Sequence, residues 1–470
     1  MRFGVRFGAV SRVGLGATGA VLLALSVSGA APAGQTIAFK RVISLGVGTF
    51  PIYGMVRTSN GTLHLVFQTT TGKSSAPSGL ATTSVGASGA VGPQTAALKG
   101  WGTSIPGLVA LPNGNLQAVF GAVSPKPDQI SGLWGITSTN GGASWSAPVE
   151  VGNQSTDEDH SYGANVTGQV SGSMPMFTLS VAGGIVVQKG LGKGVADARL
   201  TDSSDDFAGD VDSALDATSK EMVVSWQSLA HQGGDFIRGA APALQKAVRI
   251  PGRTMNEVVI SGRDSGPGVF AAYSTDGTHV RLFRYGGGSV AVGSLTGVTA
   301  KAIGTATGID GRIWVMWGDE NGGLAVTRSN KAVTQFEPIQ QVNPHAFSLY
   351  RIGGDGRLGP LDLLVEEIPV INNKTLPAGT FYGRVLPELS GTASSATLTQ
   401  KGKTVGQKLT VHVTDAGDAV AAATVSAGGK TAKTGGNGVA TLTLPASANG
   451  TVTVSVTAPT YQPLSLSATL

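Results

Sequence analysis

The sequence predicts an all-β chain, in which a β-propeller of four-stranded blades precedes a small β-sandwich. Short apolar runs are punctuated throughout by Gly, Asn, Asp and Ser, which is typical of many short strands joined by tight turns. One pattern of strand, Asn-Gly or Asp-Gly turn and alternating strand also recurs at the period of a propeller blade. At 470 residues, the chain is too long for one ordinary compact domain.

The first 33 residues are expected to form a secretory signal peptide. Three arginines occur before residue 13, an apolar stretch covers 13–27, and Ala31-Pro32-Ala33 supplies the small residues of a cleavage site. The apolar core is shorter than the about 20 residues that a membrane-spanning helix needs, so we favour cleavage over an N-terminal anchor. We expect a secreted mature chain that begins near Gly34 and has no further run of membrane-spanning length.

The net charge does not indicate a nucleic-acid partner. The chain carries 33 basic and 28 acidic residues, a net of +5. Without the three arginines of the leader, 30 basic residues face 28 acidic ones, and the net charge falls to +2. No cluster of Lys and Arg with interleaved aromatics occurs, so we expect no nucleic-acid binding. Cysteine is absent, which excludes disulfides, thiol catalysis and Cys-ligated zinc.

The propeller is predicted from a repeat between about residues 44 and 388. Its clearest copies are Asn60–Phe67, Asn113–Phe120 and Asp310–Trp317, each a turn followed by a strand that ends in an aromatic. Asn-Gly and Asp-Gly tolerate the positive φ that a two-residue hairpin loop requires. Seven such turns are 45 to 58 residues apart, and they lie near residues 61, 114, 172, 219, 266, 311 and 356.

The predicted ring closes with its first strand. The seventh copy supplies three strands, near Leu349, at 361–366 and at 381–386, whereas Ile37–Leu45 is a strand without a repeat of its own. Pairing that strand with the last blade removes two free sheet edges. We therefore predict seven blades over residues 34–388. Six blades plus an extra hairpin is the alternative, because three of the copies are weak.

A change of composition after Pro387 predicts a second unit over residues 389–470. Tyr461 is the only aromatic after Tyr382. Strands rich in Val and Thr alternate with Gly-rich turns, which indicates a β-sandwich of about 80 residues. The unit resembles bacterial Ig-like and carboxypeptidase-regulatory-like modules, and the resemblance implies a spacer or adhesive role. It is carried by Asp415-x-Gly417, Ala423-x-Val425, Gly436–Ala440 and Ala458–Tyr461.

One turn resembles the Asp box of sialidases and related propellers with BNR repeats. The segment Ser138–Trp145, STNGGASW, follows the pattern S-x-D-x-G-x-(S/T)-W with Asn140 in place of Asp, and Ser329–Pro338 resembles an eroded copy. The resemblance implies a turn between the third and fourth strands of a blade, where the box binds backbone amides and its Trp packs between blades. In those families the box lies far from the active face, so it supports the fold and not a reaction.

The sialidase resemblance also implies a catalytic set that this sequence matches only in part. Those enzymes clamp a carboxylate with three arginines and use a Glu-activated Tyr and an Asp. Their first arginine stands in an F/Y-R-I-P motif, and the corresponding segment here, Thr49–Tyr53, reads TFPIY without it. Arg253 and Arg351 are candidates to face a central channel, but two arginines do not complete the clamp.

Residues near the start of each innermost strand are the candidates for a ligand site, because these loops share one face of a propeller. The candidate ligand-binding residues are Tyr53, Trp101, His160, Tyr162, Arg253 and His345. Asp210, Asp212 and Glu257 are candidates for a pair of catalytic carboxylates. The alternative is that these polar side chains are solvated by channel water and that the aromatics pack between blades rather than stack on a sugar.

Two acidic runs, 157–160 and 205–212, are the densest acids in a chain of which 13% is charged. Carboxylates and carbonyls bind calcium, but no complete calcium-loop spacing occurs in these runs. We favour turn capping by Asp and expect no cofactor, with calcium as the alternative. His160 and His345 have no acid or His at metal-ligand spacing, so we expect them to line the channel.

Three functions remain open from the sequence. The first is a secreted, non-catalytic propeller that binds an extracellular carbohydrate or surface component, with the C-terminal module as a spacer. The second is an exo-acting glycoside hydrolase that uses carboxylates on the propeller face. The third is a scaffold that docks another protein. The missing arginine favours the first and third, whereas the acids near blades three to five keep the second open.

Overall fold

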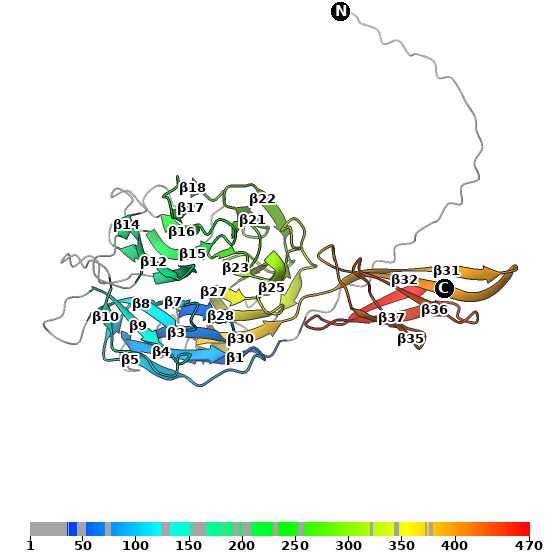
Figure 1. Cartoon of the computed structure of the whole chain (residues 1–470), viewed down its shortest axis with the longest axis horizontal. Coiled ribbons are helices and arrows are strands. Elements are labelled where there is room, and N and C mark those ends of the chain that lie inside the picture. Colours follow the sequence, from blue (N-terminus) through cyan, green and yellow to red (C-terminus); the bar gives the residue numbers. More distant parts are fainter. Residues whose placement is uncertain are drawn as a thin grey trace, which may run out of the picture.

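The computed structural model describes residues 35–470 with internal gaps. The gaps are residues 36, 45–52, 71–76, 124–131, 152–165, 182–183, 191–196, 200–207, 229–233, 252–257, 320–322, 343–346, 372–373 and 376–378. The described elements are almost all strands, and these pair into antiparallel sheets (Figure 1). The prediction of an all-β chain is therefore confirmed.

Seven sheets, numbered 1 to 7 along the chain, lie within the described residues up to 385. Sheet 1 contains β2 (Tyr53–Arg57), β3 (Leu63–Thr70), β4 (Pro77–Val85) and β5 (Thr95–Lys99). Sheet 2 contains β6 (Gly102–Thr103), β7 (Gly107–Ala110), β8 (Leu116–Val123), β9 (Gly132–Ser138) and β10 (Val149–Glu150). Sheet 3 contains β11 (Val166–Ser171), β12 (Met174–Val181), β13 (Gly184–Lys189) and β14 (Asp197–Arg199).

The next four sheets follow the same order of strands. Sheet 4 contains β15 (Ala208–Leu215), β16 (Met222–Ser228), β17 (Gly234–Ala241) and β18 (Val248–Arg249). Sheet 5 contains β19 (Ile260–Gly262), β20 (Val269–Ser274), β21 (Val280–Arg284) and β22 (Ser289–Gly293). Sheet 6 contains β23 (Ala302–Thr307), β24 (Ile313–Gly318), β25 (Leu324–Arg328) and β26 (Gln340–Val342). Sheet 7 contains β27 (Phe347–Asp355), β28 (Leu361–Ile371), β29 (Lys374–Thr375), β30 (Gly379–Val385) and the N-terminal β1 (Lys40–Ser44).

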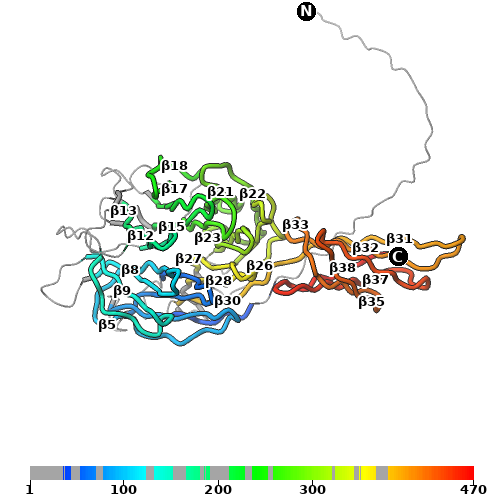
Figure 2. Tube along the Cα trace, viewed as in Figure 1, coloured from blue at the N-terminus to red at the C-terminus, as the bar shows by residue number. Residues whose placement is uncertain are grey.

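These sheets surround a central channel, as the blades of a propeller do. One strand near the start of every sheet contributes to the wall of one cavity. These innermost strands are β2, β7, β11, β15, β19, β23 and β27. The chain passes from each sheet to the next in sequence order (Figure 2). The prediction of a β-propeller is thus confirmed, whereas a count of seven blades stays a prediction.

The predicted hairpin turns connect the innermost strands to their neighbours. Gly61, Gly114 and Gly311 adopt φ angles of 84°, 85° and 76°, a region that glycine reaches without strain. Gly311 ends η2 (Ile309–Gly311), a single 3-10 turn. No helix in the described part of the chain has the length and apolar character needed to cross a membrane.

The ring closes through the first strand and through a buried ionic network. β1 pairs antiparallel with β30, which confirms the pairing predicted for the segment 37–45. Between sheets 1 and 7, Arg57 forms ion pairs with Asp355 and Asp362. The side chains of Arg57 and Asp362 are 3% and 0% exposed, so this closure is sealed from solvent.

Glycines allow the innermost strands of neighbouring sheets to touch. A Cβ atom at Gly54 would overlap the carbonyl oxygen of Pro106, and one at Gly262 would overlap the carbonyl oxygen of Leu215. Each overlap is with backbone atoms of the adjacent sheet, which cannot rotate away. The backbones of neighbouring innermost strands can therefore approach this closely only because glycine has no side chain.

Gly262→Ala is expected to lower the free energy of unfolding of the propeller by about 1–3 kcal/mol, because the new methyl group pushes β19 away from β15. Urea unfolding followed by tryptophan fluorescence measures the loss. Gly288→Ala is the matched control, since a Cβ atom there meets nothing within 4 Å. Equal stabilities of the two variants would contradict this account of the channel wall.

The residues from 390 onward form two further four-stranded sheets. Sheet 8 contains β31 (Ser390–Gln400), β32 (Lys403–Asp415), β33 (Asp418–Ala419) and β36 (Val439–Leu444). Sheet 9 contains β34 (Thr424–Ala427), β35 (Lys430–Lys433), β37 (Thr451–Thr457) and β38 (Leu464–Thr469).

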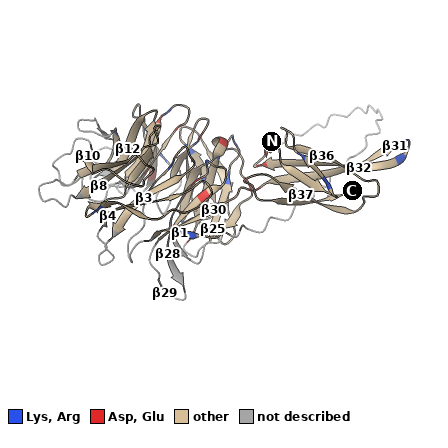
Figure 3. Ribbon diagram, turned by 60° about the horizontal axis from the view of Figure 1, so that its bottom comes forward, with Lys and Arg blue, Asp and Glu red and all other residues tan. Residues whose placement is uncertain are grey.

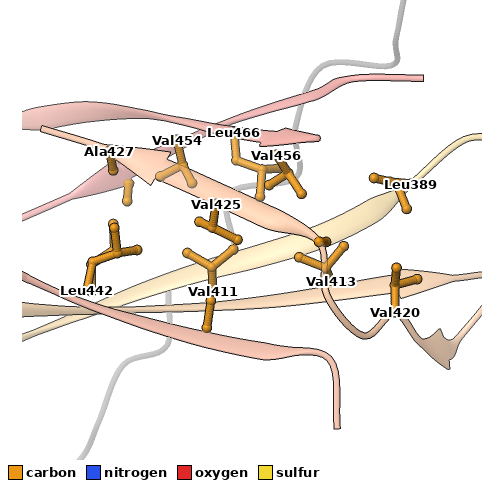
Figure 4. Close-up of a cluster of buried hydrophobic side chains, with 14 of the residues drawn as sticks. Leu389, Val411, Val413, Val420, Val425, Ala427, Leu442, Val454, Val456 and Leu466 are labelled. Atoms are coloured by element: carbon orange, nitrogen blue, oxygen red, sulfur yellow. The ribbon is translucent and has the colours of Figure 1, made fainter. Parts of the chain in front are cut away.

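Sheets 8 and 9 share one apolar core, which makes them a β-sandwich. Its buried residues come from both sheets and include Leu389, Val411, Val413, Val425, Leu442, Val454, Val456 and Leu466 (Figure 4). In β37, Val454 and Val456 are buried while Thr453, Ser455 and Thr457 are exposed, the alternation that predicts a half-buried strand. The resemblance to Ig-like modules and the boundaries at 388 and 389 stay predictions.

Candidate functional site

The central channel holds a cavity of about 410 Å³. We call the end where the innermost strands begin the upper end, and the end where they finish the lower end. Four polar side chains that face the upper part are Tyr53, Thr167, Asp212 and Arg351, which come from β2, β11, β15 and β27. We refer to these four residues as the upper site. The cavity volume lies in the range typical of small-ligand pockets.

Asp212 connects three sheets at the channel wall. Its carboxylate accepts the backbone N–H groups of Ser213 at 2.8 Å and Ile260 at 2.9 Å, and the hydroxyl of Thr167 at 3.4 Å. The pairing of β15 with β16 shifts register between Gly209 and Asp212, so a bulge directly precedes the aspartate. Bulges redirect side chains, and Asp212, the residue after this one, lies on the wall of the cavity.

Burial raises the pKa of Asp212 to about 6. The backbone N–H of Ile260 and the charge of Arg351 act in the opposite direction and hold the pKa below a still higher value. The carboxyl is therefore mostly ionised at pH 7, where it accepts hydrogen bonds. Slightly below neutral pH the carboxyl is protonated, and it can then donate a hydrogen bond.

Arg351 lies at a second bulge of the channel wall. The pairing of β27 with β28 shifts register between Leu349 and Arg351. The guanidinium lies 5.7 Å from the centre of the Tyr53 ring, within the range of a cation–π contact. Tyr53 is 7% exposed, so the arginine covers a ring that is otherwise buried. Sheets 1 and 7 therefore meet at the upper site through Tyr53 and Arg351.

The upper site combines groups that recognise hydroxyl-rich ligands. The carboxylate of Asp212 supplies acceptors, and the guanidinium of Arg351 supplies several donors in fixed directions. Thr167 and Tyr53 add hydroxyl groups that can both donate and accept. All four lie on paired strands, so the groups are held in position before a ligand arrives.

Charged groups at the lower end of the channel are already paired. Arg263 donates to the backbone carbonyls of Gly311 and Pro267. Arg357 forms an ion pair with Asp355 at 3.0 Å. We place the candidate ligand site at the upper end, where Asp212, Arg351 and Tyr53 line the cavity together.

The structure brings only part of the predicted site together. Tyr53 and Asp212 both face the cavity, as does Arg351. Trp101 does not belong to the cavity wall: it is 9% exposed and packs edge-on against Trp134, with ring centres 4.9 Å apart. Its large apolar surface is buried in a core shared by sheets 1 and 2.

The other candidates lie wholly or partly outside the part of the chain that the structure describes. His160, Tyr162, Arg253, Glu257 and His345 lie outside the described residues. Asp210 belongs to β15 by its backbone, but its side chain lies outside the described part. The acidic run 157–160 is also outside it. Among the side chains that are described, no three of His, Asp or Glu gather closely enough to hold a metal ion.

Thr167 and Gln169 are site residues that the sequence reasoning missed. Thr167 binds Asp212, and Gln169 donates to the carbonyl of Ser213 at 2.7 Å. Both also line the cavity. Alternate residues of an innermost strand face the channel. Thr167 and Gln169 are two residues apart near the start of the third repeat, and this spacing could have identified them from the sequence.

The turn that resembles an Asp box is held by side-chain hydrogen bonds. The amide oxygen of Asn140 accepts the backbone N–H of Ser144 at 2.9 Å, and the hydroxyl of Ser138 accepts the N–H of Gly142 at 2.8 Å. The turn follows β9 and precedes β10, away from the upper site. Its assignment to the BNR family stays a prediction.

No family model matches this sequence, and no curated protein matches it. Solved structures resemble it at low identity. The NanB sialidase from Streptococcus pneumoniae is 10% identical with a TM-score of 0.45, over 74% of this chain and 70% of that one. An α-L-arabinanase from Penicillium chrysogenum, complexed with arabinobiose, is 12% identical with a TM-score of 0.43, over 75% and 98%. A fungal alcohol oxidase in complex with copper is 10% identical with a TM-score of 0.42, over 93% and 100%.

Proposed function

We propose that this protein is secreted and that it binds an extracellular carbohydrate at the upper site, without catalysing its cleavage. The observation that carries the proposal is the convergence of Asp212, Arg351 and Tyr53 on one polar cavity of about 410 Å³. The leader over residues 1–33 supports export, where the available ligands are surface glycans and polymers.

The chemistry of the three groups suits a sugar. A hydroxyl of a sugar ring both donates and accepts, so it can bridge the carboxylate of Asp212 and the guanidinium of Arg351. Hydrogen bonds to charged groups each contribute about 1.5–3 kcal/mol. A ligand held by a few such bonds in an open channel binds with moderate affinity, which is typical of recognition modules.

A glycan array tests this proposal with the mature chain, residues 34–470. We expect a restricted set of glycans to bind, and Arg351→Ala to lose that binding because it removes the donors of the upper site. Arg281→Ala is the matched control, since this arginine lies exposed on β21 of sheet 5. Absence of binding to every glycan, or equal binding by both variants, would overturn the proposal.

Glycoside hydrolysis is the second candidate, favoured by the raised pKa of Asp212. With a pKa of about 6, this carboxyl is suited to act as a general acid slightly below neutral pH. A second carboxylate is also required, and Asp210 and Glu257 remain the candidates for it. A panel of chromogenic glycosides distinguishes the two functions. Turnover that falls as pH rises above about 6, and that Asp212→Asn abolishes, would select the hydrolase.

A further inference from the structure

The propeller and the sandwich meet at a junction of buried charges. Arg312, which directly precedes β24 of sheet 6, pairs with Asp415 at 3.1 Å and with Asp418 at 2.8 Å, both of sheet 8. Arg312 and Asp415 are 5% and 0% exposed at their side chains, and Asp418 is 28% exposed. Charged residues are sparse along the ribbon (Figure 3), and this junction is a second buried cluster of them besides the one at the ring closure.

Arg328, the last residue of β25, lies at the centre of this junction. Its guanidinium pairs with Glu337 at 3.1 Å and with Asp415 at 2.7 Å. The rings of Trp314 and Tyr461 lie on it at 5.3 and 5.4 Å. The side chain is 1% exposed, so one buried arginine joins residues of both units.

Carboxyl groups outnumber guanidinium groups at the junction. The two arginines face Glu337, Asp415 and Asp418, and a fourth carboxyl, Glu388, is buried in the connecting segment. The backbone N–H of Glu388 donates to Glu337 at 3.1 Å. Among the described residues, the hydroxyl of Tyr461 donates to Asp415, the ammonium group of Lys331 pairs with Asp310 at the surface, and the guanidinium of Arg263 donates to the backbone carbonyls of Gly311 and Lys331.

With all four carboxyls ionised, the junction would hold two uncompensated negative charges. Uncompensated charges are costly away from water, and buried carboxyls respond by keeping their protons. We propose that the junction is a proton-dependent lock, which holds the sandwich against the propeller while Glu337 and Glu388 are protonated and loosens as they ionise. This inference goes beyond the proposed ligand and does not depend on it.

The direction of the pKa shifts agrees with this arrangement. Burial raises the pKa of Glu388 to about 7 and raises the pKa of Glu337 well above its ordinary value. Burial acts against ionisation of Asp415 as well, but the hydrogen bond with Glu337 and the charges of Arg328 and Arg312 lower its pKa. Glu337 therefore holds the proton of the pair, and Asp415 stays ionised between pH 5 and 8.

The sign of the pH dependence follows from linkage. A carboxyl with a raised pKa in the docked state binds its proton more tightly there than in the open state. Docking is therefore strongest at or below the ordinary glutamate pKa of about 4.5. Docking weakens as pH rises toward about 7, where Glu388 ionises even in the docked state. Above that pH, the contribution of Glu388 to docking changes no further.

Hydrogen exchange of the mature chain at pH 5 and pH 8 tests the lock. Each rate is divided by the intrinsic rate at that pH to give a protection factor. Peptides spanning 328–338 and 385–390 contain the amide of Lys331, which donates to Asp418 of the sandwich, and the amide of Glu388, which donates to Glu337. We expect their protection factors to fall at least tenfold from pH 5 to pH 8, since each unit of pKa shift is worth about a factor of ten. Peptides from β3 serve as the internal reference.

Replacement of the two acids by amides distinguishes a lock from a general effect of pH. Glu337→Gln with Glu388→Gln is expected to keep equal protection at both pH values, and Glu388→Gln alone to reduce the pH effect. Glu221→Gln, a part-exposed carboxyl at the start of β16, is the matched control. Equal protection factors of the unsubstituted chain at both pH values would overturn the lock. The lock would also be overturned if either amide variant showed the same fall in protection factor as the unsubstituted chain.

Discussion

Asp362→Ala is expected to lower the free energy of unfolding of the propeller by about 3–5 kcal/mol, the range for breaking a buried ion pair by removing one partner. The carboxylate of Asp362 is fully buried and accepts hydrogen bonds from Arg57 at 2.6 Å, Tyr382 at 2.7 Å and Arg384 at 2.8 Å. Its loss leaves the guanidinium of Arg57 with one buried carboxylate, Asp355, beside the carbonyl of Gly61. The closure between sheets 1 and 7 is therefore the part of the ring that should open first.

Tryptophan fluorescence during urea unfolding measures this effect in the propeller alone. The six tryptophans lie between residues 101 and 317, so none of them belongs to the sandwich, and Trp314 alone among them contacts Arg328 of the junction in the described residues. Glu221→Ala is the control, because its part-exposed carboxyl lies at a hairpin of sheet 4. A loss below about 1 kcal/mol in Asp362→Ala would show that closure depends on β1 and apolar packing and not on the ionic network.

Arg328→Ala is expected to have an effect of similar size, about 3–5 kcal/mol, at the junction of the two units. The substitution leaves the carboxyls of Glu337 and Asp415 without the guanidinium that joins them. It also removes a buried contact with the rings of Trp314 and Tyr461. We expect the sandwich to separate from sheet 6 and the stability of the chain to fall.

Urea unfolding and hydrogen exchange across residues 385–390 measure this second effect. Arg328→Lys should recover only part of the loss, because an ammonium group cannot reach two carboxylates in the fixed geometry of a guanidinium. Arg281→Ala, at an exposed position of sheet 5, should leave both measurements unchanged. Unaltered exchange in Arg328→Ala would contradict the assignment of this arginine as the centre of the junction.

The repeat and its closure could be predicted because their signals are local. Asn60-Gly61 and Asn113-Gly114 specify hairpins by the φ that their glycines adopt, whatever the rest of the chain does. The segment 37–45 had no repeat of its own, and the need to cover a sheet edge was enough to pair it with the last sheet.

The ionic networks could not be predicted because their partners are far apart in sequence. Arg57 and Asp362 are separated by 305 residues, and neither differs in type from a solvated surface residue. The same holds for Arg328 and Asp415, which only the docking of the two units brings together. The role of these residues depends on their burial, and a single sequence does not reveal which charged residues are buried.

The candidate site was predictable in its location and only partly in its members. The start of each innermost strand indicated Tyr53 and Asp212, and both face the cavity. The same rule also selected Trp101, whose apolar surface favours the core beside Trp134 over the channel. Asp212 and Arg351 each follow a bulge, and a bulge of one residue leaves no clear mark on an alternating pattern.

The central claim is that the upper site binds a carbohydrate through Arg351 and Asp212. Titration calorimetry with the tightest glycan found on the array tests it most directly, with the mature chain, Arg351→Ala and Arg281→Ala measured side by side. We predict that Arg351→Ala raises the Kd at least tenfold, equivalent to the loss of about 1.4 kcal/mol or more, while Arg281→Ala leaves it unchanged. The same Kd for Arg351→Ala and the unsubstituted chain would contradict the claim.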